Sequence, residues 1–320
     1  MPAAVTVPFE LHAEVWTLIV GVAALGWYTS RVVQPKAVSA GYPPITLVQK
    51  AWFVLALGLM WLVSDWPVHE IAEQHLYFVH MFQHLFLSML IPLFFVLATP
   101  RWLFELVITP GTPLWRFFRT GSKPLVAGLV FNALTMLLHW SRLVQLSFES
   151  GAVHFALHLL IFVAGLLMWM PVFGPVDEWR LTPLAQCFYL FAMSIVPTVP
   201  GGWLVFAEDV VYRHYDTPER LWGIDVLSDQ QAAGVVMKLV GGFVLWALIF
   251  FVFTRWANRE MAKGEQERLE QQRAARERLA QEDDIDLDGP VEAADPDVLT
   301  FEQVSREFAK TPPAPDTDEA

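Results

Sequence analysis

The side chains of this 320-residue chain that are best suited to chemistry are its nine histidines. Two pairs are spaced four residues apart, His80 with His84 in HMFQH and His154 with His158 in HFALH. This spacing puts both rings of a pair on one face of a helix. Neutral imidazole is a common ligand for copper, iron and zinc, and a nearby thioether adds a preference for Cu(I). The pairs therefore predict a metal site, with metal-free hydrogen bonding between helices as the alternative.

Other residues extend or limit this candidate site. His139 precedes the second pair, so one ligand set can draw on three consecutive helices. Met81 and Gln83 lie between His80 and His84 and are expected on the same inward-facing stripe, because polar groups inside lipid must face protein or water. His214 is expected at the surface. The only cysteine, Cys187, excludes a disulfide or a cysteine-based metal site within the chain.

The elements that must position these residues are membrane-spanning helices. The chain is 55% hydrophobic, which is more than a soluble domain normally shows. Apolar stretches of about 18 or more residues can cross a hydrocarbon core of about 30 Å as helices. Pro92 predicts a kink in the third span, and Pro197 predicts a break in the sixth. We expect an all-α polytopic membrane protein with seven spans, at residues 13–33, 47–64, 77–97, 124–140, 152–172, 184–206 and 235–256.

Charge separates the chain into three parts. Residues 1–256 are expected to form the seven-helix transmembrane domain, followed by a charged cytosolic helical extension at 257–282 and an acidic, mostly disordered tail at 283–320. Residues 264–320 contain 6 Lys or Arg and 17 Asp or Glu, which accounts for nearly all of the net charge of −12. The acidity therefore says nothing about the partners of the membrane domain.

The basic residues of the loops predict the orientation. With seven spans, one side holds eleven Lys or Arg and the other side three. Because cytoplasmic loops carry the excess of Lys and Arg, the amino terminus is predicted outside and the carboxyl terminus inside. All nine histidines then fall at the outer side, and the inner loops have none.

The segment DQQAAGVVMKLVGG leads into the last span and carries several local signals. Asp229 or Ser228 is expected to cap this helix, since short oxygen-bearing side chains accept from free N–H groups in the first turn. Gly234 and the pair Gly241–Gly242 predict close approach of neighbouring helices. Lys238 must reach outward or pair with an acid such as Asp229.

Several of these segments, taken in order, resemble a known family. HMFQHLFLSMLIPLFFVLATP is similar to the HMxxH segment and the proline-containing apolar run of the seven-helix CtaG proteins, the caa3-type cytochrome c oxidase assembly factors of bacteria. HFALH, LLMWMPVFGP, VYRHY and DQQAAGVVM follow in the same order. The resemblance covers about residues 45–255.

The resemblance implies a multi-pass protein of the bacterial inner membrane that handles copper, as Cu(I), for a haem–copper oxidase and is not an enzyme. The expected partners are oxidase subunits, periplasmic copper chaperones and the lipid bilayer, with no nucleic acid. By residue match, the resemblance assigns the metal-site role to His80, His84, His154, His158 and Met237, with His75 and His139 as additions.

Two other functions stay open on the residues alone. Two histidines on facing helices, such as His84 and His158, could ligate a b-type haem and make the chain an electron-transfer protein. Alternatively, the chain is a structural subunit associated with the oxidase, whose histidines bind nothing. The packing of an apolar helix is the alternative role for Met237.

Overall fold

The computed structural model describes residues 7–283, 304–306 and 310, and within these residues it is helical with no strand. The predicted all-α fold is confirmed. Contacts divide the chain into two units, Met1–Asn258, here called the bundle, and Arg259–Ala320. Most of the predicted acidic tail, residues 283–320, lies outside the described residues.

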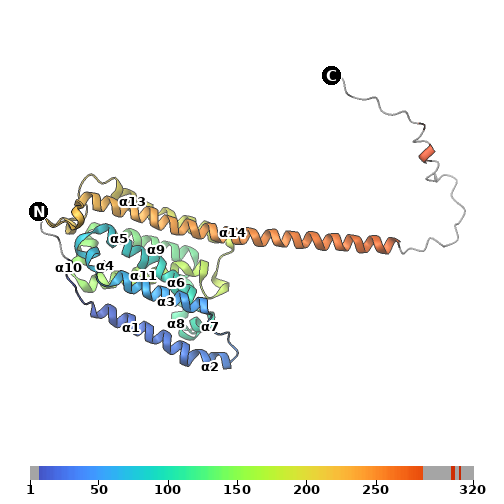
Figure 1. Ribbon diagram of the computed structural model, residues 1–320, viewed down its shortest axis with the longest axis horizontal. Coiled ribbons are helices and arrows are strands. Elements are labelled where there is room, and N and C mark those ends of the chain that lie inside the picture. Colours follow the sequence, from blue (N-terminus) through green and yellow to red (C-terminus); the bar gives the residue numbers. More distant parts are fainter. Residues whose placement is uncertain (1–6, 284–303, 307–309, 311–320) are drawn as a thin grey trace, which may run out of the picture. The chain divides into compact units, whose positions relative to one another are not determined.

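Helices that can cross a membrane make up most of the bundle (Figure 1). Six segments of the described chain are long and apolar enough for this, or seven if one bent pair of helices counts as a single span. The predicted number of seven therefore depends on that pair. The six segments are Ala13–Ser39, Leu47–Ser64, Tyr77–Ala98, Gly151–Phe173, Pro183–Val205 and Val226–Arg278.

The bent pair corresponds to the predicted fourth span. Helix α8 (Pro113–Gly121) meets helix α9 (Pro124–Leu138) at a bend of 80°. Lys123 precedes a proline and has the extended backbone that this position favours, so the helix cannot continue through it. Because α9 has only 15 residues, it is shorter than the roughly 20 residues that usually cross a membrane.

The span that carries the first histidine pair changes its helical type along its length. It consists of α5 (Tyr77–Leu85), the π-helical segment η3 (Phe86–Leu90) and α6 (Ile91–Ala98). Pro92 lacks an N–H group and its ring crowds the carbonyl one turn earlier, which accounts for the wider turn before it. The Trp169 indole donates to the Met89 carbonyl oxygen at 2.7 Å and satisfies an acceptor within this turn. The distortion predicted from Pro92 is therefore a π-helical turn directly after α5.

Helix α11 (Gly151–Phe173) carries the second histidine pair and packs against the first pair's span. A Cβ atom at Gly165 would lie 2.1 Å from the carbonyl oxygen of Ser88, so only glycine allows the two backbones to approach this closely. Buried Met168 and Trp169 of α11 join the largest apolar core. This tight crossing brings the two histidine-bearing helix faces together.

Helix α3 (Leu47–Ser64) packs on α6, and α1 (Ala13–Tyr28) packs on α3. No residue of α1 is buried, and Figure 1 shows α1 at one edge of the bundle. His12, the residue before α1, nevertheless turns inward with a side chain that is 11% exposed. The edge helix thus contributes a histidine to the interior at its amino end.

Two aspartates at the start of α14 (Val226–Asp283) have different roles. Asp225 caps α14 by accepting from the backbone N–H of Ser228 at 3.0 Å. Asp229 is fully buried and accepts from the backbone N–H groups of Tyr77 and Phe78, at 2.8 and 3.0 Å. The prediction that Asp229 or Ser228 caps α14 is therefore wrong, because Asp225 is the cap. Asp229 instead caps α5, whose free N–H groups it reaches across the bundle.

The two glutamines that follow Asp229 fasten the long loop before α14. Gln230 is fully buried, accepts from the backbone N–H of Val211 and of Tyr212, and donates back to the Tyr212 carbonyl oxygen. Gln231 donates to the Ala207 carbonyl oxygen at 3.0 Å. The DQQ segment thus ties together α14, the loop and the helix that carries His80 and His84.

Helix α13 (Thr198–Val205) follows a break at Val196–Pro197 in the predicted sixth span. Small residues allow α13 and α14 to pack closely. A Cβ atom at Gly234 would lie 2.5 Å from the Gly201 carbonyl oxygen, so the predicted close approach at Gly234 is confirmed. A Cβ atom at Gly242 would meet nothing within 4 Å, so Gly242 makes no close approach.

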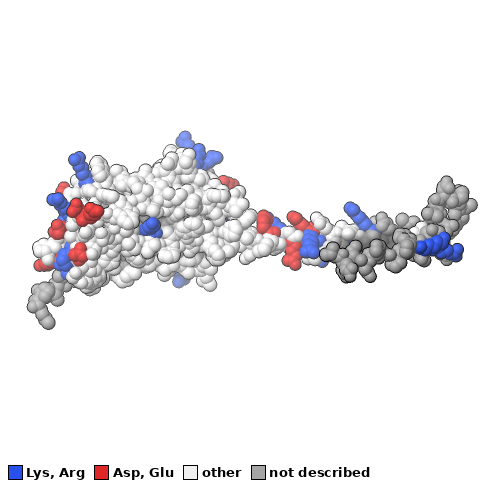
Figure 2. Space-filling view, turned by 90° about the horizontal axis from the view of Figure 1, so that it is seen from above, with Lys and Arg blue, Asp and Glu red and all other residues white. Residues whose placement is uncertain are grey.

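Figure 2 shows the charged residues of the bundle gathered at its two ends, with a broad band between them that is nearly free of charge. Such a band suits the hydrocarbon core of a bilayer. Lys238 is exposed on α14 and forms no described ion pair with Asp229, which is engaged with α5. Of the two expected arrangements for Lys238, the outward one is therefore observed.

Candidate metal centre

Three histidines form a compact cluster where α5 meets α11. His80, His84 and His158 each offer one ring nitrogen, and these three atoms lie within 4.8 Å of one another. The Nε2 atoms of His84 and His158 are 3.0 Å apart. We call this group the three-histidine cluster. It contains both members of the first predicted pair and one member of the second.

The three-histidine cluster adjoins a cavity of about 20 Å³. A space of about this size holds one water molecule or one ion. His80 is 5% exposed, and its buried Nδ1 atom has no hydrogen-bond partner. Met81 is 3% exposed and lines the same cavity. Around one ion with metal–nitrogen bonds of about 2.0 Å, three imidazole nitrogens lie about 3.5 Å apart, which is compatible with the spacing in the cluster.

His154, the other member of the second pair, lies beside the cluster. Its ring centroid is 4.2 Å from that of His158 and 6.0 Å from that of His80. Its Nε2 atom is 2.7 Å from a carboxylate oxygen of Glu73. His154 therefore connects the three-histidine cluster to a second polar group nearer the end of the bundle.

That second polar group is centred on Glu73 in the π-helical segment η2 (Ile71–His75). The same Glu73 oxygen that approaches His154 also lies 3.1 Å from Nε2 of His69. Gln83 donates to the Val63 carbonyl oxygen and contacts His69 Nδ1 at 3.1 Å. An amide N–H facing Nδ1 leaves the ring proton on Nε2, the nitrogen that faces the Glu73 carboxylate.

Two further groups complete this network. His12 lies edge-on to His69, with ring centroids 4.7 Å apart, and its Nε2 atom is 3.3 Å from a carboxylate oxygen of Glu70. His214 donates to the Glu73 carbonyl oxygen at 2.9 Å and stacks on Phe148. The expectation that His214 is a surface residue is therefore wrong, because it is half-buried and points inward from the loop that the DQQ segment fastens.

Burial and neighbouring charges both shift the pKa values of the titratable groups outside the spans. Burial lowers the pKa of His69, and this outweighs the attraction of Glu73. Burial acts to raise the pKa of Glu73, but the imidazoles of His154 and His69 outweigh it and hold that pKa below its ordinary value. Burial raises the pKa of Glu70, and Glu10 adds to this effect. The surroundings of Glu73 therefore favour its negatively charged form.

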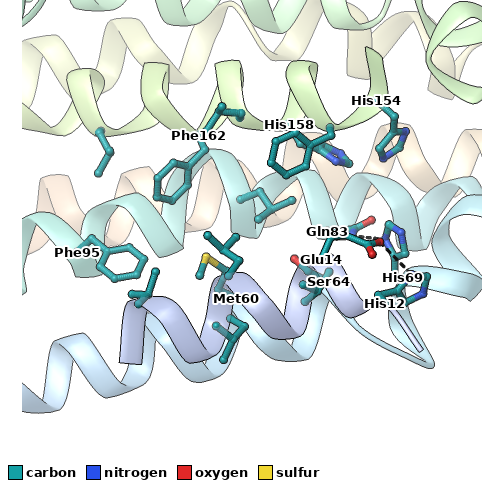
Figure 3. Close-up of a pocket in the computed structure, with 18 of the residues that line it drawn as sticks. His12, Glu14, Met60, Ser64, His69, Gln83, Phe95, His154, His158 and Phe162 are labelled. Carbon is teal, nitrogen blue, oxygen red and sulfur yellow. Dashed lines mark hydrogen bonds and ion pairs between the residues drawn. The ribbon is translucent and has the colours of Figure 1, made fainter. Parts of the chain in front are cut away.

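A second, much larger cavity of about 1100 Å³ opens beside both groups (Figure 3). Figure 3 shows His154 and His158 on one side of it and His12 and His69 on the other. Its far part is apolar and includes Phe95 of α6. The histidines therefore occupy the polar end of a long, mostly apolar space.

The remaining predicted site residues lie elsewhere. His75 is half-buried at the end of η2, and no described contact links it to the three-histidine cluster. His139 is 9% exposed, and its Nδ1 atom lies 2.6 Å from the Thr135 carbonyl oxygen. Met237 packs in an apolar cluster with Met81 and Tyr77 and does not line the small cavity.

The structure also adds residues to the candidate site. The sequence predicts Met81 on the inward-facing stripe of His80 and His84, but only the structure shows that Met81 lines the small cavity and Met237 does not. Glu73 and His69 precede α5 in a segment without apolar periodicity, and their convergence on His154 depends on tertiary contacts 80 residues apart along the chain.

Fold and site together define a polytopic, all-helical membrane protein with a buried imidazole cluster at one end of its bundle. Residues 26–259 match the family model described as cytochrome c oxidase caa3 assembly factor (Caa3_CtaG). Because the match covers most of the chain, this protein belongs to that family of assembly factors. No curated protein and no solved structure matches the chain.

Proposed function

We propose that the protein binds Cu(I) at the three-histidine cluster and supplies it to a cytochrome c oxidase during assembly, from the outer face of the bacterial inner membrane. The observation that carries this proposal is the convergence of His80, His84 and His158 on one small buried space. The family match supports the link to the oxidase.

The chemistry of the donors favours copper over harder cations. Imidazole nitrogens suit copper and zinc, whereas magnesium and calcium prefer oxygen ligands. Met81 adds a thioether at the same cavity, and thioether sulfur favours Cu(I). No carboxylate is among the described residues that line this small cavity. A neutral ligand set suits a monovalent ion that must later be released.

The b-type haem alternative fits the cluster less well. Two axial imidazoles on opposite faces of an iron must have their nitrogens about 4 Å apart, given metal–nitrogen bonds of about 2.0 Å. His84 and His158 are in contact at 3.0 Å, with no space for a porphyrin between their rings. A Soret band from protein expressed with sufficient haem would nevertheless establish haem binding, and its absence would remove this alternative.

The functional test is oxidase assembly in cells that lack the endogenous protein. We expect the double variant His80→Ala/His84→Ala to reach the membrane in normal amount but to leave cytochrome c oxidase activity at the level of the deletion strain. Phe82→Leu is a suitable control, because Phe82 lies on the same helix but is 39% exposed. Normal oxidase activity in the double variant would reject the proposed function.

A further inference from the structure

The large cavity and the small cavity are separated by two histidines. His154 and His158 line both spaces, together with Ser147, whereas His80 and His84 line only the small one. His80, the most buried of the three clustered histidines, is 5% exposed. An ion that approaches from the large cavity must therefore pass His154 and His158 before it reaches the rest of the cluster.

The polar end of the large cavity is suited to cations. Four carboxylates line it, and no Lys or Arg is among its described lining residues. Carboxylates grouped in a low-dielectric cleft focus the field and raise the local concentration of cations. The four are Glu10, Glu14, Glu70 and Glu73.

Among these four carboxylates, only Glu73 forms a described ion pair with His154, a histidine that also lines the small cavity. Gln83 fixes the orientation of His69, and Nε2 of His69 lies 3.1 Å from the Glu73 carboxylate. His214 holds the Glu73 backbone through its carbonyl oxygen. Such outer partners orient a ligating carboxylate and are typical of metal sites. The carboxylate is thereby aimed at His154 Nε2, 2.7 Å away.

The contact between Glu73 and His154 is close, but it is not an aligned hydrogen bond. Nε2 of His154 is buried and lacks a hydrogen-bond partner by geometry, although the carboxylate oxygen is near. His154 and His158 are adjacent, with ring centroids 4.2 Å apart. An ion held between Glu73 and His154 would therefore be next to the first ligand of the three-histidine cluster.

We propose that Glu73 and His154 form a loading site, at which Cu⁺ leaves the large cavity and is passed by way of His158 into the three-histidine cluster. This assignment rests on the proposed copper binding, and it adds the route and the residue that controls its rate. Glu73 makes loading fast, whereas the three-histidine cluster determines the equilibrium affinity.

The test measures the rate and the affinity of Cu⁺ binding separately. Full-length protein in detergent is mixed anaerobically with Cu⁺, supplied as its acetonitrile complex, and loading is followed against a chromophoric Cu⁺ chelator. We expect Glu73→Gln to slow loading on the order of tenfold or more, the range by which focusing charges change association rates, while its Kd stays within about twofold of the wild-type value. Glu14→Gln is the matched control, because Glu14 lines the same cavity but has a 69% exposed side chain and no contact with His154.

Each outcome separates loading from binding. Wild-type loading kinetics in Glu73→Gln, or an equal loss of rate in Glu14→Gln, would overturn the loading site and leave the proposed function intact. A weakened Kd with an unchanged association rate would make Glu73 a structural support instead. Failure of the wild-type protein to bind Cu⁺ would overturn both proposals.

A measurement on the wild-type protein covers the case in which Glu73→Gln does not fold. Attraction by the carboxylates is screened by salt, so the loading rate should fall as sodium sulfate is raised from low to physiological ionic strength and beyond. A loading rate independent of ionic strength would contradict a carboxylate-lined route.

Discussion

At the scale of single residues, the candidate centre combines one predicted pair with half of the other. His80 and His84 share a helix face, as their spacing predicts, and His158 reaches them from α11. His154 instead contacts Glu73 and lies between two cavities. The pair His154 and His158 is therefore divided: His158 belongs to the three-histidine cluster, and His154 contacts Glu73. This division depends on which residues each ring contacts on the neighbouring elements.

The two candidate thioether ligands give a test at this scale. We expect Met81→Leu to weaken Cu(I) binding by about tenfold, because the sulfur that lines the small cavity is removed while the apolar volume is kept. Met237→Leu should leave the affinity unchanged within about twofold, since Met237 packs beside Met81 outside that cavity. Competition titrations of both variants check this, and a larger effect of Met237→Leu would return the ligand role to the residue indicated by family resemblance.

At the scale of elements, helix crossings bring the site residues together. Because Gly165 has no Cβ atom, the backbone of α11 can lie close to that of Ser88. Gly201 and Gly234 likewise allow the backbones of α13 and α14 to lie close together. Asp229 then connects α14 to the start of α5. The histidine-bearing helices are thus held by contacts that contain no histidine.

Two of the glycines of α14, Gly234 and Gly242, allow the contribution of the helix crossing to stability to be measured. Gly234→Ala would place a methyl group 2.5 Å from the Gly201 carbonyl oxygen, so we expect a loss of about 1–3 kcal/mol in the free energy of unfolding, typical of overpacking. Gly242→Ala meets no atom within 4 Å and should be neutral or slightly stabilising, because alanine favours the helix. Thermal unfolding in detergent compares the two, and equal stabilities would contradict the crossing described for α13 and α14.

Much of the fold could be predicted from the sequence, because the length of an apolar stretch identifies a membrane span without knowledge of tertiary contacts. The bounds of the third and fifth spans differ from the predicted ones by a single residue at most. The bend at Lys123 and the cross-helix cap by Asp229 could not be predicted, since each depends on where neighbouring elements lie. The same limit applied to the site: spacing identified the histidine pairs, whereas Glu73 and His69 join them only through side-chain contacts with His154 of α11.

At the scale of the whole molecule, the histidine network occupies one end of the bundle. Contacts join His12, His69, His154 and His158 to one another and to α5, and His214 reaches the same group from the loop before α14. The predicted orientation would expose this end to the periplasm, the side from which the proposed function requires copper to enter.

The orientation is tested by labelling single cysteines introduced into a Cys187→Ser background. Glu219 is exposed in the loop before α14, and Arg119 is exposed on α8. A membrane-impermeant maleimide should label Glu219→Cys in intact cells and label Arg119→Cys only after the membrane is opened, because the basic loops are predicted inside. The reverse pattern would place the histidine end in the cytoplasm.

The most direct measurement of the central claim is an anaerobic Cu(I) titration of the purified, full-length protein beside His80→Ala/His84→Ala. We expect one tightly bound equivalent of Cu(I) in the wild-type protein that is lost in the double variant, while Phe82→Leu retains it. Equal copper binding by the wild-type protein and the double variant would contradict the assignment of the three-histidine cluster as the copper site.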